Sequence, residues 1–285
     1  MKIKTKTILI LFSLLVIFVS GCLEEKQIIS IDKPGNISSY EFEVSPDEWS
    51  NGVLANTTTY HIMENKTQVQ AVHFVINTSK IEIIPTEDLG GNSEKTPLKD
   101  LVLLVSPANE TKLNQETLME LSNRTEVSNI NYTLYQKVSS GVKIITLEFE
   151  EPVTGFIAYT FEVTGNQNFV FVKPDSEFIK VILPKGYSTG NRFFGIPSPT
   201  PANITFDGEG KQTLLWNSSE MGNREKTIQV KFYPENAPIY FFAAIVALLA
   251  GSVLVLIHYS RSKKELEIER EILELEKRYE KKKQK

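Results

Sequence analysis

The chain has one cysteine, Cys22, among its 285 residues. A single cysteine excludes an intrachain disulfide framework, so any part outside the cell must be held together by core packing. The sequence also has no H-E-x-x-H, C-x-x-C, P-loop or G-x-G-x-x-G pattern, the short motifs that mark common metal and cofactor sites. We therefore expect a protein without catalytic, metal or cofactor-binding residues, which is not an enzyme.

Positive charge is scarce in the middle of the chain. The whole sequence has 31 Lys/Arg and 35 Asp/Glu, a net charge of −4. Three lysines precede Cys22, and residues 260–285 contain ten basic and seven acidic side chains, which leaves 18 basic and 28 acidic residues between them. A segment with a net charge of −10 argues against nucleic-acid binding, which needs a basic surface.

The N-terminus has the pattern of a secretory signal. Three lysines among the first six residues precede the apolar run Ile8–Val19, which at 12 residues is too short to cross a bilayer. Small residues, Ser20 and Gly21, come directly before Cys22, as a lipoprotein signal peptidase requires. We predict a lipoprotein-type signal peptide over 1–21 with a lipid on Cys22. Ordinary signal cleavage that leaves a free cysteine, or an uncleaved anchor, are the alternatives.

A second apolar run lies near the C-terminus. Residues Ile239–Tyr259 form 21 consecutive residues with no charge before Ile257, long enough for a spanning helix. We predict a transmembrane helix over 238–259. The basic tail 260–285 that follows indicates a cytoplasmic C-terminus by the positive-inside rule. The expected protein is a single-pass cell-membrane protein with residues 22–238 extracellular.

The tail 260–285 is rich in helix-forming residues and is predicted to be a charged helix. Ile268, Ile272, Leu275 and Tyr279 follow the spacing of a coiled-coil seam. The tail could contact a helical partner, lie on anionic lipid headgroups, or remain solvated.

Asparagine is concentrated in glycosylation signals. Nine of the 18 asparagines between Cys22 and Pro238 start an Asn-x-Ser/Thr sequence. Such sites accept a sugar only in a secreted context and on exposed chain, so we predict an N-glycosylated glycoprotein. The candidates are Asn36, Asn56, Asn65, Asn77, Asn109, Asn123, Asn131, Asn203 and Asn217.

The extracellular part has the alternating pattern of β-strands. Apolar and polar residues alternate in Gln68–Asn77 and through 145–163, and Gly, Pro and Asn turn signals separate the strands. We expect a mainly β protein with a tether over 22–39 and two antiparallel β-sandwich-like ectodomains. The first, 40–135, includes a short helix near 114–122, and the second, 136–236, is an immunoglobulin-like sandwich.

Two patterns suggest chemistry but are better explained without it. Gly186-Tyr-Ser188-Thr-Gly190 matches the G-x-S-x-G nucleophile elbow, yet loop residues follow it where the elbow needs a helix. A turn bracketed by the two glycines is the preferred interpretation. His61 and His73 lie on the two arms of an expected hairpin and face each other in one possible register, near Glu64, but two ligands are too few for a metal site.

The chain resembles a family of uncharacterised archaeal membrane-anchored surface proteins. The resemblance rests on 182–199, which includes Asn191-Arg-Phe-Phe-Gly195, on Leu215-Trp216, and on Ile228–Tyr233 leading into the span. It implies a lipoprotein-type signal, a β-rich ectodomain, one C-terminal span and a short charged tail, and it implies no activity.

The function expected from these features is a non-enzymatic module on the archaeal cell surface. It would act in adhesion, in envelope organisation or as an accessory to an envelope protein or glycan, held by a lipid on Cys22 and one spanning helix. The alternative is a sensor or accessory subunit of a membrane complex that acts through the helix and tail. A surface serine hydrolase at Ser188 is a further alternative.

Overall fold

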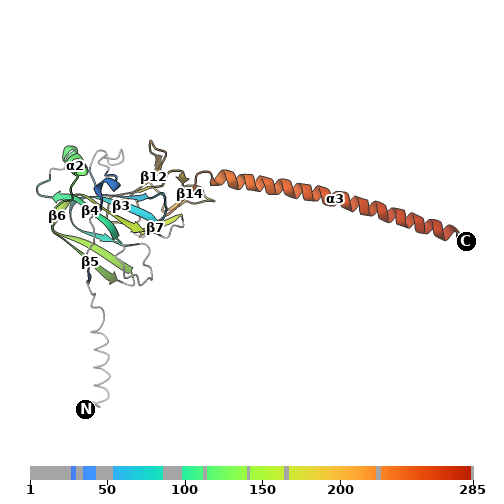
Figure 1. Cartoon of the computed structure of the whole chain (residues 1–285), viewed down its shortest axis with the longest axis horizontal. Helices are drawn as coiled ribbons and strands as arrows, with labels where there is room; N and C mark the ends of the chain where they lie inside the picture. The colour runs from blue at the N-terminus through green and yellow to red at the C-terminus, as the bar shows by residue number, and fades with distance from the viewer. Residues whose placement is uncertain are drawn as a thin grey trace, which may run out of the picture. The chain divides into compact units, whose positions relative to one another are not determined.

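The computed structural model describes residues 27–29, 35–42, 54–85, 98–111, 114–139, 142–163, 167–222 and 226–283. The expected signal peptide over 1–21 and the lipidation site at Cys22 lie outside these residues. The described chain divides into two units, one ending at Tyr233 and the other starting at Pro234. Figure 1 traces the chain with the element labels used below.

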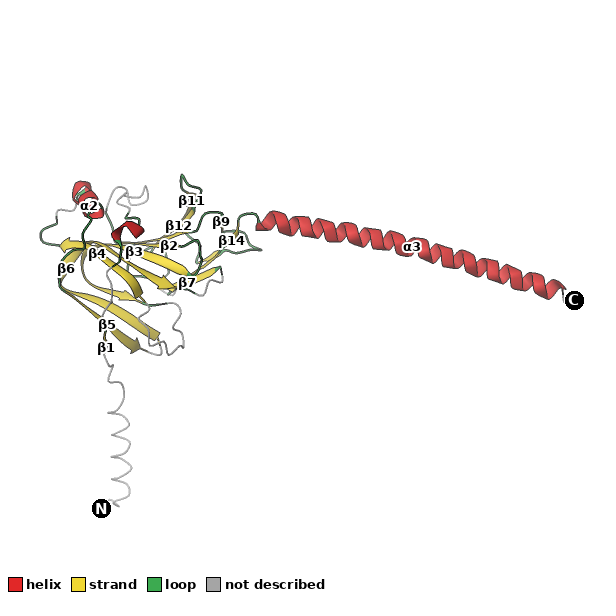
Figure 2. Ribbon diagram, in the orientation of Figure 1, coloured by secondary structure: helices red, strands yellow, loops and turns green. Residues whose placement is uncertain are grey.

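The unit that ends at Tyr233 is built mainly from strands, as expected, and Figure 2 colours them apart from the helices. The strands are β1 (Gln27–Ile28), β2 (Thr57–Ile62), β3 (Gln68–Ile83), β4 (Leu98–Pro107), β5 (Tyr132–Ser139), β6 (Val142–Glu162), β7 (Asn168–Val172), β8 (Phe178–Ile182), β9 (Tyr187–Ser188), β10 (Pro197–Ser198), β11 (Asn203–Phe206), β12 (Gln212–Asn217), β13 (Thr227–Lys231) and β14 (Tyr233–Pro234). The helical elements are a 3-10 turn, η1 (Ile37–Ser39), with α2 (Gln115–Ser122) and α3 (Ala237–Lys283).

One nine-stranded sheet forms the main layer. Its hydrogen-bonded order is β1-β5-β6-β3-β2-β8-β12-β11, and β4 also pairs with β6. The pairs are antiparallel except β2 with β8, which run parallel. A three-stranded sheet, β10-β13-β7, and the pair β14-β9 complete the strands.

The two expected ectodomains are one unit in the structure. The expected boundary between residues 135 and 136 falls inside β5, and β2 from the first half pairs with β8 from the second. Local alternation predicts strands but not their partners, so nothing in the sequence showed that strands 121 residues apart share a sheet. The expected tether over 22–39 is also not a free linker throughout, because β1 lies within this range and pairs with β5 of the main sheet.

The long strands β3 and β6 pair with each other along a shared bend, and between them they also pair with β2, β4 and β5. The register between them shifts on either side of Thr78, and Asn77 adopts a positive φ of 51° there. Gly155 of β6 lies opposite Val75 with a φ of 144°. A Cβ at this glycine would lie 2.2 Å from the carbonyl oxygen of Leu104, so only glycine permits β4 to approach β6 so closely.

Each face of the main sheet buries its own apolar cluster. The larger cluster lies between the main sheet and the three-stranded sheet, and includes Trp216, Tyr159 and Phe171. The smaller cluster on the opposite face is covered by α2, whose Leu118 and Leu121 are buried. The Asn114 side chain accepts from the Thr117 backbone N–H at 2.7 Å, an N-cap that fixes the start of this predicted helix.

The second unit consists of α3, one continuous helix of 47 residues. Residues Ala237–Leu275 are long and apolar enough to cross a membrane, with a mean hydropathy of 2.6 over the most apolar window. The expected span over 238–259 and the expected tail helix therefore belong to the same helix. This length is compatible with single-pass anchoring.

Candidate functional site

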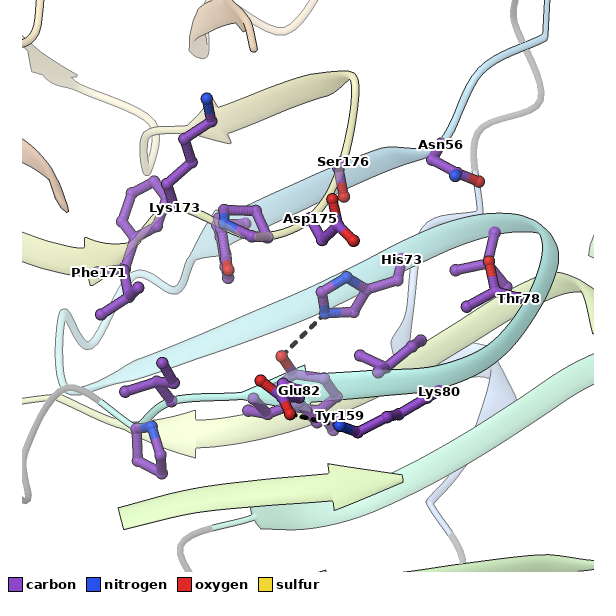
Figure 3. A pocket seen from close by; sticks show the side chains of 18 of the residues that line it. Asn56, His73, Thr78, Lys80, Glu82, Tyr159, Phe171, Lys173, Asp175 and Ser176 are labelled. Atoms are coloured by element: carbon purple, nitrogen blue, oxygen red, sulfur yellow. Dashed lines mark hydrogen bonds and ion pairs between the residues drawn. The ribbon is translucent and has the colours of Figure 1, made fainter. Parts of the chain in front are cut away.

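A cavity of about 560 Å³ opens between the main sheet and the three-stranded sheet. We call it the inter-sheet pocket. Figure 3 shows the bend of β3 on one side and the loop after β7, with Asp175 and Ser176, on the other. Its lining is formed by Asn56, Tyr60, His73, Val75, Thr78, Lys80, Ile81, Glu82, Ile83, Ile84, Pro85, Tyr159, Phe161, Phe171, Val172, Lys173, Pro174, Asp175 and Ser176. Its volume lies within the range of small-molecule sites.

Aromatic rings form the inner wall of the inter-sheet pocket. The rings of Tyr60 and Phe171 are 4.5 Å apart between centroids, and Tyr60 meets the Phe161 ring edge-on at 6.3 Å. The alternation of β2, β6 and β7 directs these side chains into the space between the sheets, where each is buried. Packed rings hold one another in place, so this wall is a preformed apolar surface.

A chain of hydrogen bonds joins the pocket rim to its inner wall. The Ser176 and Thr58 hydroxyls are 2.5 Å apart, and the Thr58 hydroxyl is 2.9 Å from His73 Nδ1. On the other side of the ring, His73 Nε2 lies 2.9 Å from the Tyr159 hydroxyl. We call Ser176, Thr58, His73 and Tyr159 the hydroxyl–histidine chain. It connects the loop after β7 with strands β2, β3 and β6.

Burial keeps His73 neutral. Desolvation of the fully buried ring lowers the pKa of His73 to about 4, and burial raises the pKa of Tyr159 well above its ordinary value. A neutral imidazole has one donor and one acceptor nitrogen. At neutral pH His73 therefore donates on one side of the ring and accepts on the other.

The tautomer of His73 sets what Ser176 offers to the pocket. If Tyr159 donates to Nε2, then Nδ1 donates to Thr58, Thr58 donates to Ser176, and the Ser176 hydroxyl can donate into the pocket. In the reverse order, Nε2 donates to Tyr159 and Nδ1 accepts from Thr58, so Ser176 donates to Thr58 and presents only its lone pairs to the pocket. The Tyr159 O–H then needs another acceptor. The first order satisfies every buried donor within the hydroxyl–histidine chain, so it is the favoured one.

The rim carries balanced charge. Lys80 donates to Glu82 at 2.6 Å, and this hydrogen bond raises the pKa of Lys80 and lowers the pKa of Glu82. Lys173 donates to the Ser218 carbonyl oxygen at 3.1 Å. Asp175 lies on the same loop as Ser176 and is exposed. Because the charges balance, the rim has no preference for a strongly anionic or cationic ligand.

A second hollow of about 500 Å³ adjoins the inter-sheet pocket. Asn56, Asp175 and Ser176 line both. The second hollow continues over Asn217, Ser218 and Ser219, so its lining is polar. The two hollows together form a concave surface in which the loop after β7 is the common wall.

The two histidines do not face each other. His61 pairs with Gln70, whereas His73 pairs with Thr58. The register differs by an odd number of residues from the one that would oppose the histidines, so the two side chains lie on opposite faces of the sheet. His61 Nδ1 is 3.9 Å from a carboxylate oxygen of Glu41. Within the described residues, no group of three His, Cys, Asp or Glu side chains could hold a metal.

Ser188 lies in the short strand β9, with its hydroxyl 3.4 Å from the carbonyl oxygen of Thr189. The next residues form a hairpin-like loop closed by the bridge between Asn191 and Gly195, where a nucleophile elbow needs a helix. Gly186 and Gly190 both have positive φ, as the predicted turn requires. The G-x-S-x-G match therefore belongs to a turn.

The nine predicted glycosylation asparagines all lie within the described residues, and none is buried. Asn56, Asn203 and Asn217 are half-buried, and the other six are exposed. Asn56 and Asn217 line the second hollow, and the Asn56 side chain accepts from the Ile76 backbone N–H at 2.7 Å. Glycosylation of these sites stays a prediction.

The sequence drew attention to His73 only as a possible metal ligand beside His61. It gave no sign of Thr58, Tyr159 and Ser176. These three residues are ordinary strand and turn residues without a motif. Only the pairing of β2 with β3 and β8, and of β3 with β6, brings them together. A histidine on an otherwise apolar strand face was the one available signal.

Comparison with known proteins gives a family without an assigned activity. The model of a family described as "Family of unknown function (DUF5803)" matches residues 55–278. The match covers most of the chain, from just before β2 into α3, so the chain belongs to this family. No curated protein and no solved structure matches the chain.

Proposed function

We propose that this chain is a non-enzymatic binding module on the archaeal cell surface, anchored by α3 and exposed to the outside. The inter-sheet pocket carries the proposal. Its volume, its aromatic inner wall and its polar rim are the properties of a site that holds a small polar group. The membership in DUF5803 and the long apolar helix are consistent with it.

We propose a neutral sugar of an envelope glycan as the ligand. A sugar presents C–H faces that pack on aromatic rings and hydroxyls that exchange hydrogen bonds. The pocket supplies Tyr60 and Phe171 for the first contact, and Ser176 and Asp175 at the rim for the second. The balanced charge of the rim favours a neutral group, because an unpaired charge would be desolvated without compensation.

A role in binding, and not in catalysis, agrees with the state of His73. Both ring nitrogens are engaged and burial lowers the pKa of His73 to about 4, whereas a general base works best with a pKa near the working pH. Under the proposal, the hydroxyl–histidine chain orients the Ser176 hydroxyl for a ligand. Lipid on Cys22, sugar on the exposed asparagines and a cytoplasmic tail remain parts of the proposal.

Binding of glycans released from native envelopes tests this proposal. Full-length protein in lipid nanodiscs would be mixed with the released neutral glycans, and bound sugars would be measured by mass spectrometry. Asp175→Asn, which exchanges a charged acceptor for a neutral one, and Ser176→Ala, which removes a hydroxyl, should each weaken binding about tenfold. Glu150→Gln, an exposed carboxylate on β6 outside the pocket lining, is the control. Equal binding by the three variants and the wild type would refute a sugar site at this pocket.

The continuity of α3 favours one second candidate. A single helix from Ala237 to Lys283 could pass a change outside the cell to a partner inside, as a sensor or accessory subunit would. Deletion of 262–285 should then produce the same cellular phenotype as loss of the whole protein, although the protein stays in the membrane. Cells that keep the wild-type phenotype after this deletion would exclude the role.

A further inference from the structure

The most exposed large apolar side chain in the described part of the β-rich unit is Phe193. It is 84% exposed, and Ile196, three residues later, is 49% exposed. Both belong to the segment Gly190–Ile196, which we call the Phe193 loop. An isolated exposed aliphatic residue needs no explanation, but an almost fully exposed phenylalanine beside a second apolar residue at a loop tip does.

Phe193 is exposed at the tip of a loop whose backbone is held by several hydrogen bonds. The Gly190 N–H donates to the Gly195 carbonyl oxygen at 2.9 Å, and the Asn191 carbonyl oxygen accepts from the N–H groups of Phe194 and Gly195. The Asn191 side-chain oxygen also accepts from the Phe193 N–H at 2.9 Å. These bonds hold the tip in a conformation that directs Phe193 outward.

The base of the loop contacts β13 and β14, the last two strands before α3. Thr189 donates to the Lys231 carbonyl oxygen at 2.5 Å. A Cβ on Gly195 would lie 2.7 Å from the same oxygen, so the loop backbone is packed directly on β13. The Phe194 ring lies 5.4 Å from the Tyr233 ring between centroids. The loop is therefore bound to the residues at which the β-rich unit ends.

The chain leaves very little distance between this base and the span. Tyr233 is followed four residues later by Ala237, the first residue of α3. Four residues of extended chain reach at most about 14 Å, and the headgroup layer on each side of the hydrocarbon core is about 5–7 Å thick. The linker therefore sets an upper limit of about 14 Å on the distance between Tyr233 and the first residue of α3.

We propose that the Phe193 loop inserts into the headgroup region of the membrane that α3 crosses. Phenylalanine in this layer buries its ring against acyl chains, and Arg192, which is exposed next to it, has a side chain long enough to reach lipid phosphates. Ile204 and Phe206 of β11 extend the apolar surface, since the Ile204 side chain lies about 4.0 Å from a Cβ placed on Gly190. The proposal rests on α3 being the span.

Site-directed fluorescence can test this insertion in the full chain. Cys22 is the only cysteine, so Cys22→Ser provides a background for single labels. In that background Phe193→Cys would carry an environment-sensitive nitrobenzoxadiazole dye, with the protein in nanodiscs of phosphatidylcholine and phosphatidylglycerol. Met119→Cys, on α2 and 51% exposed, is the control for an exposed apolar position. Leu248→Cys in α3 is the control for the span.

We expect the dye at position 193 to emit at shorter wavelength than at 119 and to be quenched by lipids with nitroxides near the headgroup. The dye at 248 should be quenched by nitroxides deep in the acyl chains. If 248 is quenched while 193 behaves like 119, the loop faces water and the inference is wrong. A dye at 193 shielded from iodide but unquenched by lipid nitroxides would show a protein covering the loop, which also overturns it. An unquenched dye at 248 would refute the membrane span, and the loop insertion with it.

Discussion

Acid should weaken the fold through His73. The ring is buried and neutral, and burial lowers the pKa of His73 from 6.5 to about 4. Between pH 6.5 and 4, His73 is therefore protonated in the unfolded chain but stays neutral in the folded protein. Stability is fully present above pH 6.5 and is lost as the pH falls toward 4. With these two pKa values, the loss between pH 7.5 and 5 is about 2 kcal/mol.

Denaturant titration of the full chain in detergent micelles measures this loss. Trp216 is 1% exposed, so its fluorescence reports unfolding of the β-rich unit. The free energy of unfolding would be measured at pH 7.5 and pH 5 for the wild type, for His73→Gln and for His61→Gln. The carboxylates contribute equally to all three proteins, so the difference between their pH dependences isolates each histidine.

The wild type should lose about 2 kcal/mol more stability than His73→Gln between pH 7.5 and 5, and the loss in His61→Gln shows how much of the wild-type pH dependence comes from the other strand histidine. Only the pH dependence reports on the ionisation of His73, because His73→Gln also alters the hydroxyl–histidine chain and with it the absolute stability. Equal losses in the wild type and His73→Gln would show that His73 titrates normally in the folded protein. A histidine ring titration by NMR that gave His73 a pKa near 6.5 would refute the reasoning in the same way.

Two further predictions concern the backbone and the anchors. In a denaturant titration, Gly155→Ala should lower the free energy of unfolding by about 3 kcal/mol or more, because a Cβ there would lie 2.2 Å from the Leu104 carbonyl oxygen at a positive φ. Gly222→Ala, whose Cβ would meet no atom within 4 Å, should change the free energy of unfolding little, and equal effects of the two substitutions would contradict the close approach. Cys22→Ser should remove a lipid-sized mass from the intact protein while the protein stays in the membrane fraction, because a spanning helix by itself anchors the protein effectively irreversibly. Loss from that fraction would show that α3 does not span.

Local sequence was sufficient for the elements whose physics is local. The uncharged run Ile239–Tyr259 fixes a long apolar helix whatever surrounds it, since an isolated span needs only its own hydrogen bonds. Asn114 and the apolar pair Leu118 and Leu121 fixed α2 within one residue. Strand alternation likewise gave the mainly β class and the hairpin of β2 and β3.

The sequence failed where distant segments had to be paired. The expected division at residue 135 cut through β5, because alternation says which face of a strand is buried but not which strand lies beside it. Even within the hairpin of β2 and β3, alternation could not choose the register, and the one that would place His61 opposite His73 is not the one observed. A register that differs by an odd number of residues reverses the face of every side chain along the strand.

The candidate site shows this limit most clearly. His73 could be noticed in the sequence as a polar residue on an apolar strand, but its partners Thr58, Tyr159 and Ser176 come from three other segments, up to 118 residues apart. Composition and hydropathy alone determined that the protein is mainly β and has a helix able to span a membrane. The pocket, the neutral state of His73 and the exposed Phe193 were decided only by the tertiary structure, because burial and hydrogen bonding depend on which strands meet.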